Sequence, residues 1–141
     1  MSTLILDFGL QSDLFWDPLD EDAVKAAAEN GFSFFEIWGH APWFDIYSAS
    51  MASDTRRMAE ERGMWVRSVH APCEADWDIS SESQSVRKKS IHEVVLSIER
   101  CREMGGQLVV VHPGRAVTAQ GADAEAEFNR RVDRSISSFA E

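Results

Sequence analysis

Cysteine is scarce in this sequence, with two residues in 141, and no apolar run is long enough to span a lipid bilayer. Two cysteines are too few for a disulfide framework, so the composition favours a reducing compartment. The N-terminus, MSTLILDFGLQSD, has no basic region and contains the acidic Asp7, which argues against a secretory signal. We therefore expect a cytoplasmic protein with no membrane partner.

Positive charge is also scarce. The chain has 14 Lys and Arg against 24 Asp and Glu, a formal net charge of −10. A broad nucleic-acid surface needs clustered Lys and Arg, so we expect no nucleic-acid partner, although a local basic groove stays open. The glycines form neither a GxGxxG pattern nor a P-loop, and no GxSxG elbow is present. The usual signatures of nucleotide binding and of serine hydrolases are therefore lacking.

What the sequence does contain is an alternation of short apolar runs with helical patterns, and 44% apolar residues are ample for a core. The predicted strands are residues 3–10, 32–40, 64–72 and 107–114. The predicted helices are residues 18–31, 53–63, 83–106 and 123–141. A βαβαβαβα order predicts an α/β fold of parallel strands joined by helical crossovers. A flavodoxin-like sheet shares this order and is the alternative fold.

Two helices carry details that a structure can test. We expect the helix at 53–63 to begin at a Ser53 or Asp54 cap and to end at Gly63. The longest helix should face the core through one apolar stripe of Ile91, Val94, Val95, Ile98 and Cys101. The last helix repeats this pattern with Phe128, Val132, Ile136 and Phe139.

Three predicted strands end in a histidine followed closely by proline, in EIWGHAP, WVRSVHAP and LVVVHPG. The histidines are His40, His70 and His112. Long loops follow these ends, whereas the opposite turns are short and contain glycine. In βα proteins the functional site lies at the carboxyl ends of the strands, so we expect the three histidines on one rim.

Strand parity places a polar face beside these histidines, since side chains two residues apart share a face. Glu36 shares its face with Phe34, Trp38 and His40, and Ser68 shares its face with Val66 and His70; Leu108, Val110 and His112 share the face of the fourth strand. Such a face suits a barrel lumen better than a helix-covered surface, which disfavours the flavodoxin-like alternative. The same reasoning turns Asp7 inward. Arg67 has the opposite parity, so we expect it to snorkel or to pair with an acid.

The segments VRSVHAP, DWDISS and REMGGQLVVVHPG, with FEIWGHAPWFD before them, resemble the xylose-isomerase-like TIM barrel superfamily over about residues 3–139. That superfamily includes sugar-phosphate isomerases and epimerases and the apurinic endonucleases. The resemblance implies a (β/α)₈ barrel, which takes about 250 residues when complete. Residues 1–141 would then be the N-terminal half of one barrel domain, with its first four βα units. A natural half-barrel that pairs with a partner is the alternative.

The resemblance also implies an activity. We expect a sugar or sugar-phosphate isomerase or epimerase, in which a divalent metal (Zn, Mn, Mg or Co) polarises a carbonyl while a carboxylate moves a proton. The main metal glutamate and the catalytic base would lie beyond Glu141, so the isolated chain should be inactive. The alternatives are an apurinic endonuclease and a non-enzymatic half-barrel that binds a small molecule or a partner. A homo-oligomer is compatible with each.

The resemblance suggests His70 and His112 as metal ligands, because they match two ligand positions of the endonuclease branch. In the isomerase branch such histidines hydrogen-bond the sugar or lie behind the metal ligands instead, and the plainer possibility is that they tie the rim loops together. Cys73 could be a soft ligand, but a small buried loop residue is the better interpretation.

The substrate-binding candidates are Glu36, His40, Trp43 and His70. Glu36 is the one acid within an apolar strand, where an unpaired carboxylate would be costly. It would bind a sugar hydroxyl or hold a ligating histidine, or else belong to an internal polar network. His40 precedes an aromatic loop with Trp43, Phe44 and Tyr47, which would stack on a sugar or simply pack on itself.

Overall fold

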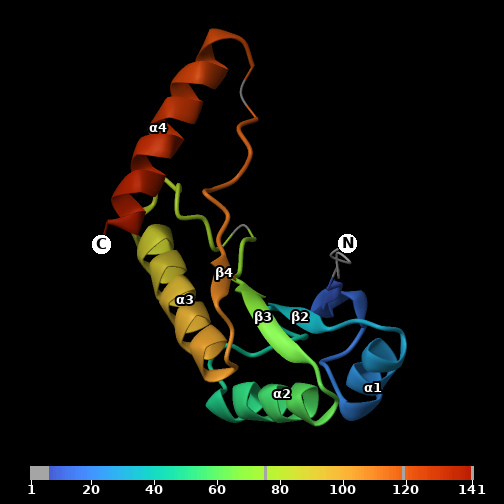
Figure 1. Cartoon of the computed structure of the whole chain (residues 1–141). Helices are drawn as coiled ribbons and strands as arrows, with labels where there is room; N and C mark the ends of the chain where they lie inside the picture. Colours follow the sequence, from blue (N-terminus) through green and yellow to red (C-terminus); the bar gives the residue numbers. More distant parts are fainter. Residues whose placement is uncertain (1–6, 75, 119, 141) are drawn as a thin grey trace, which may run out of the picture. The chain divides into compact units, whose positions relative to one another are not determined.

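The structure of the chain is a computed structural model that describes residues 7–74, 76–118 and 120–140. Its elements alternate along the sequence (Figure 1). They are β1 (Gly9–Gln11), a 3₁₀ turn η1 (Ser12–Leu14), α1 (Glu21–Glu29), β2 (Phe34–Trp38), α2 (Ala49–Glu61), β3 (Trp65–His70), α3 (Gln84–Glu103), β4 (Leu108–Val110) and α4 (Ala122–Phe139). The predicted α/β class and the βα alternation are confirmed.

The four strands form one sheet in the order β1-β2-β3-β4, and every pairing is parallel. A strand order that follows the sequence is that of a barrel wall. A doubly wound sheet reverses its order at a switch point, so the flavodoxin-like alternative is wrong.

The first strand lies later than predicted. Residues 7 and 8 are exposed and lie outside it, so the inward orientation of Asp7 stays a prediction; residues 3–6 of the predicted strand lie outside the described residues. Gly9 explains the position, because a Cβ atom there would stand 2.0 Å from the Phe34 ring. Only glycine lets β1 approach β2 this closely, and the inward side chain is then Gln11.

Two helices, α1 and α2, begin at side-chain caps. Asp20 accepts a hydrogen bond from the Ala23 amide at 2.8 Å and starts α1. Ser48 accepts from the Met51 amide at 3.2 Å, so α2 begins at Ala49, ahead of the predicted Ser53 or Asp54 cap. Gly63 ends α2 as predicted, with a positive φ of 71°.

The described chain divides into two compact units. The first comprises Met1–His70 and Leu96–Val110, and the second comprises Ala71–Val95 and Val111–Glu141. The hydrophobic core lies in the first unit, where Phe35 and Ile37 of β2 pack with Val66 and Val69 of β3. Helical side chains such as Val24, Ala27, Ala52, Ala59 and Cys101 cover them.

A β-bulge interrupts the pairing of β2 with β3. Phe35 pairs with Val66, but the next residue of β2, Glu36, pairs with Ser68, so Arg67 is one residue extra. Val66 therefore points into the core, and the prediction that it shares a face with Ser68 is wrong. Arg67 lies over the Phe34 ring, 5.1 Å from its centroid, which replaces the expected snorkelling or acid partner with a cation–π contact.

The stripe predicted for α3 is only partly correct. Cys101 is buried, but Val95 and Ile98 are about half exposed. The helix instead buries a face of small and polar side chains, Ser90, Glu93, Ser97 and Arg100. Serine has little bulk and bonds locally, as when the Ser90 hydroxyl donates to the Val86 carbonyl at 2.8 Å, so such a face can pack closely.

In the second unit, polar contacts fasten the DWDISS segment to α4. Arg131 Nη1 lies 3.3 Å from Asp78 Oδ2, and Arg134 Nε donates to the Ser80 carbonyl at 2.6 Å. The Ser138 hydroxyl donates to the Ile79 carbonyl at 2.8 Å. Glu127 accepts from Arg131 at 2.8 Å. Burial opposes ionisation of Glu127, but hydrogen bonds from its arginine neighbours outweigh burial and lower its pKa.

The apolar stripe of α4 is exposed in the described structure. Its members Phe128, Val132, Ile136 and Phe139 are between 37% and 63% exposed, and they line a hollow of about 590 Å³ together with Pro113 and Val117.

Among the described helices, none is long and apolar enough to cross a membrane.

The core gives a first prediction. Phe35 is fully buried, so Phe35→Ala should lower the free energy of unfolding by about 3–5 kcal/mol. Phe8 is 61% exposed, and Phe8→Ala is the matched control, with an expected change within about 0.5 kcal/mol. Urea unfolding followed by circular dichroism measures both. Equal losses in the two variants would contradict this assignment of the core.

The sheet gives a second prediction. Within the described residues β1 and β4 each pair with a single strand, and β4 exposes Leu108 and Val110. Unpaired strand edges favour association, so the 141-residue chain should be dimeric, aggregated or only marginally stable. Sedimentation velocity and a thermal melt measure this. A monomer with a sharp melt at about 45–65 °C, the ordinary mesophile range, would count against a half-barrel.

Candidate functional site

The polar face of the sheet holds a hydrogen-bonded carboxylate, Glu36. Its Oε1 accepts from Gln11 Nε2 at 2.9 Å, and its Oε2 accepts from the Ser68 hydroxyl at 2.8 Å. The three residues come from three adjacent strands at paired positions. Both donors are neutral, so they fix the orientation of the carboxylate without neutralising its charge. A carboxylate has about four acceptor sites, and further hydrogen-bond donors can therefore reach it.

His70 closes β3 and lies against Trp38, the last residue of β2. The two ring centroids are 4.3 Å apart, the planes are inclined by 32°, and His70 is only 7% exposed. The Trp38 amide donates to the Ser12 hydroxyl oxygen at 2.8 Å, which joins the end of β2 to the turn after β1. The His70 ring is thus packed against the Trp38 ring at the end of β3.

Gly39 makes this close approach possible. Its amide donates to the His70 carbonyl at 2.9 Å, and a Cβ atom at this position would stand 2.8 Å from the same carbonyl oxygen. A side chain there would push apart the ends of β2 and β3.

The aromatic loop after β2 has mixed roles. Phe44 is buried in the core, and the Trp43 indole donates to the Phe15 carbonyl at 2.7 Å, so these two side chains pack the loop against the protein. Tyr47 is exposed and His40 is partly buried. The loop therefore packs on the protein through Phe44 and Trp43, and whether His40 and Trp43 bind substrate stays a prediction.

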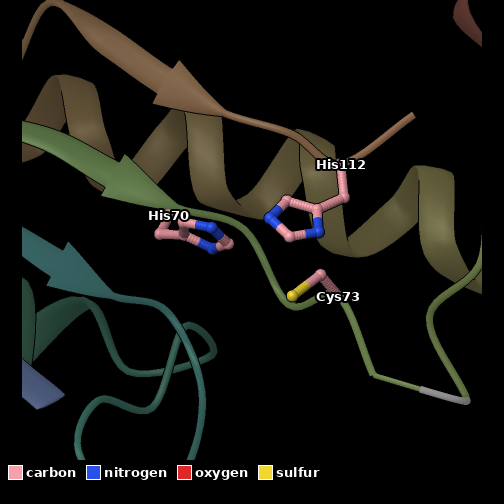
Figure 2. Close-up of side chains that lie close together, drawn as sticks. All are labelled: His70, Cys73 and His112. Atoms are coloured by element: carbon pink, nitrogen blue, oxygen red, sulfur yellow. The ribbon is translucent and has the colours of Figure 1, made fainter. Parts of the chain in front are cut away.

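Cys73 and His112 lie close together in the second unit (Figure 2). The Cys73 sulfur and an imidazole nitrogen of His112 are within 4.8 Å of each other. Cys73 is partly buried and His112 is exposed. Burial, and then the charge of Glu74, raise the pKa of the Cys73 thiol, so the thiol is protonated at neutral pH unless a cation displaces the proton.

The predicted metal ligands are related through the strand register. His70 pairs with Val110 of β4, and His112 follows Val110 by two residues. His70 therefore ends β3 as predicted, whereas the fourth strand is shorter than the predicted 107–114 and His112 lies in the segment after it. Metal ligation by this pair stays a prediction.

Two residues of the site were missed by sequence reasoning. Gln11 lies one residue beyond the predicted end of the first strand, so the sequence pattern does not mark it. The pattern places Trp38 on the correct face, but it does not identify Trp38 as the partner of His70. The feature that indicates this contact is the position of Trp38, because it ends β2 as His70 ends the neighbouring strand β3.

The comparisons with known proteins agree with this architecture. The family model described as "Xylose isomerase-like TIM barrel" matches residues 24–141. No significant match is found among curated proteins. Among solved structures, a D-tagatose 3-epimerase-like protein superposes with a TM-score of 0.75 at 22% identity, covering 96% of this chain and 46% of its own.

Two further structures repeat this result. The 3-keto-D-glucoside 4-epimerase of E. coli gives a TM-score of 0.69 at 18% identity, covering 96% of this chain and 51% of its own. A D-psicose 3-epimerase solved with D-fructose gives 0.68 at 16% identity, covering 92% and 46%. The chain thus spans about half the length of these solved structures, and it is a member of the xylose isomerase-like TIM barrel family.

Proposed function

We propose that the chain contributes the first four βα units of a metal-dependent sugar isomerase or epimerase, and that the polar face of its sheet binds the hydroxyl groups of the sugar. The single observation that carries this proposal is the oriented carboxylate of Glu36 between Gln11 and Ser68. The structural relatives include sugar epimerases, which supports the same substrate class. With two cysteines, the cytoplasm stays the proposed location.

The chemistry of the polar face suits a polyol. Glu36 accepts hydrogen bonds from hydroxyl groups, and Gln11 and Ser68 can each accept and donate. Hydrogen bonds to a charged group are worth about 1.5–3 kcal/mol each, more than those between neutral groups. A site built to bond a hydroxyl discriminates strongly against an analogue without it, because the carboxylate is then left without its donor.

The metal proposal rests on donor chemistry. Neutral imidazoles are good ligands for zinc and related divalent ions; His70 ends β3, and His112 follows the last residue of the neighbouring strand β4 by two positions. When bound, a divalent cation would polarise the sugar carbonyl and lower the cost of removing the adjacent proton. The carboxylate that moves this proton, and a glutamate that completes the ligand set, are proposed to come from outside residues 1–141, so the chain alone would be inactive.

Substitution of Glu36 tests the substrate site. Glu36→Gln keeps the shape of the side chain but removes its charge, and should raise KM for a ketohexose at least tenfold in the complete gene product, since a charge-assisted hydrogen bond is lost. Glu29→Gln, on the exposed side of α1, is the control and should leave KM unchanged. Epimerisation of D-fructose and D-tagatose is followed by chromatography. An unchanged KM in Glu36→Gln would assign Glu36 to an internal polar network.

Substitution of His112 separates metal binding from sugar binding. If His112 ligates the metal, His112→Ala should lower metal affinity by at least about tenfold and reduce turnover. If it contacts the sugar, KM should rise while the metal content stays intact. Metal analysis of the purified variant, run beside steady-state kinetics, distinguishes the two. Full metal content with unchanged kinetics would make His112 a purely structural residue.

An apurinic endonuclease is the second candidate, because the positions of His70 and His112 resemble two ligand positions of that branch. Net charge decides our preference, since at −10 the chain is poorly suited to a DNA backbone. We expect no retention of abasic duplex DNA at physiological salt in an anisotropy titration. Salt-sensitive binding at micromolar protein would favour the endonuclease.

Sugar binding without turnover in the complete gene product would favour a non-enzymatic binding module.

A further inference from the structure

The proposed function makes no use of Cys73, although its position is suited to metal binding. It is partly buried and follows two buried residues, Ala71 and Pro72. Pro72 restricts the backbone next to Cys73, which reduces the entropy lost when the side chain binds a ligand.

A second observation comes from within the second unit. The Cys73 sulfur and a His112 nitrogen lie within 4.8 Å of each other. A sulfur and a nitrogen bound to one tetrahedral zinc ion stand about 3.6 Å apart, given bond lengths of about 2.3 and 2.0–2.1 Å. The His112 imidazole is exposed, so rotation about its side-chain torsions is sterically open to close the remaining distance (Figure 2).

We propose that Cys73 is a metal ligand, acting with His112 to bind a thiophilic divalent cation of the Zn²⁺ type in preference to Mg²⁺. On binding, the sulfur–metal bond replaces the S–H bond and the proton passes to the solvent. Thiolate is a soft ligand that favours zinc-like ions over magnesium. One thiolate and one imidazole leave tetrahedral positions open for the further ligands of the proposed metal site. The inference deepens the proposed function and rests on its metal site.

Cobalt titration of the purified chain tests the proposal, because a thiolate bound to Co²⁺ gives a charge-transfer band in the near ultraviolet that imidazole ligands do not give. Wild-type protein should show the band, and Zn²⁺ should abolish it while excess Mg²⁺ should not. Cys73→Ser should lose the band and bind Co²⁺ at least about tenfold more weakly. Cys101→Ala keeps Cys73 as its one cysteine and is the matched control, which should retain the band. Thermal melts verify that both variants fold.

The outcomes separate this inference from the proposed function. Cobalt bound without a charge-transfer band, and with equal affinity in Cys73→Ser, would overturn the role of Cys73 and leave a metal site of the two histidines intact. Displacement of Co²⁺ by Mg²⁺ at comparable concentration would overturn the proposed preference. A band lost in Cys101→Ala but kept in Cys73→Ser would show that Cys101 supplies the thiolate ligand, and it would overturn the proposal. Absence of cobalt binding in every protein would overturn the role of Cys73 in this chain, and it would not bear on a histidine site that a glutamate from outside residues 1–141 completes.

Discussion

The polar face of the sheet depends on one extra residue in β3, Arg67. Without it, the alternation of the strand would place Val66 and Ser68 on the same face. With it, Val66 and Val69 both pack in the core, while Ser68 reaches Glu36 and His70 reaches Trp38. Bulges redirect side chains next to functional sites, and they are rare between parallel strands. The cation–π contact of Arg67 with Phe34 stabilises the inserted residue by about 0.5–1 kcal/mol.

The sequence shows the elements of this fold more clearly than their ends. Hydrophobic periodicity and glycine turns are sufficient to predict the βα alternation, and the parity of β2 and β4 is correct. A pattern that assumes a strict period of two cannot predict the bulge. The one sequence feature that reflects it is the spacing of Val66 and Val69, two core valines three residues apart. The start of β1 was placed too early because its apolar residues precede Gly9, whose role becomes clear only beside the Phe34 ring.

The candidate site could be predicted in part for the same reasons. His70 and His112 lie at or just after the ends of β3 and β4. These two candidate residues, and the edge of the sheet to which they belong, can therefore be predicted from the sequence. The hydrogen bonds of Glu36 depend on which residues stand opposite it, and Gln11 could be found only with the correct register of β1. The buried serines of α3 show the same limit, since the apolar stripe of this helix only partly coincides with the face that it buries.

Gly39 carries a consequence for the diversification of this rim. Its amide bonds the His70 carbonyl, and the space that a Cβ atom would need is taken by that oxygen. A combinatorial library aimed at new substrate preferences would therefore keep Gly39 and vary other residues of the rim. Laboratory evolution would change the chemistry around this glycine, while the close approach of β2 and β3 at their ends stays constant.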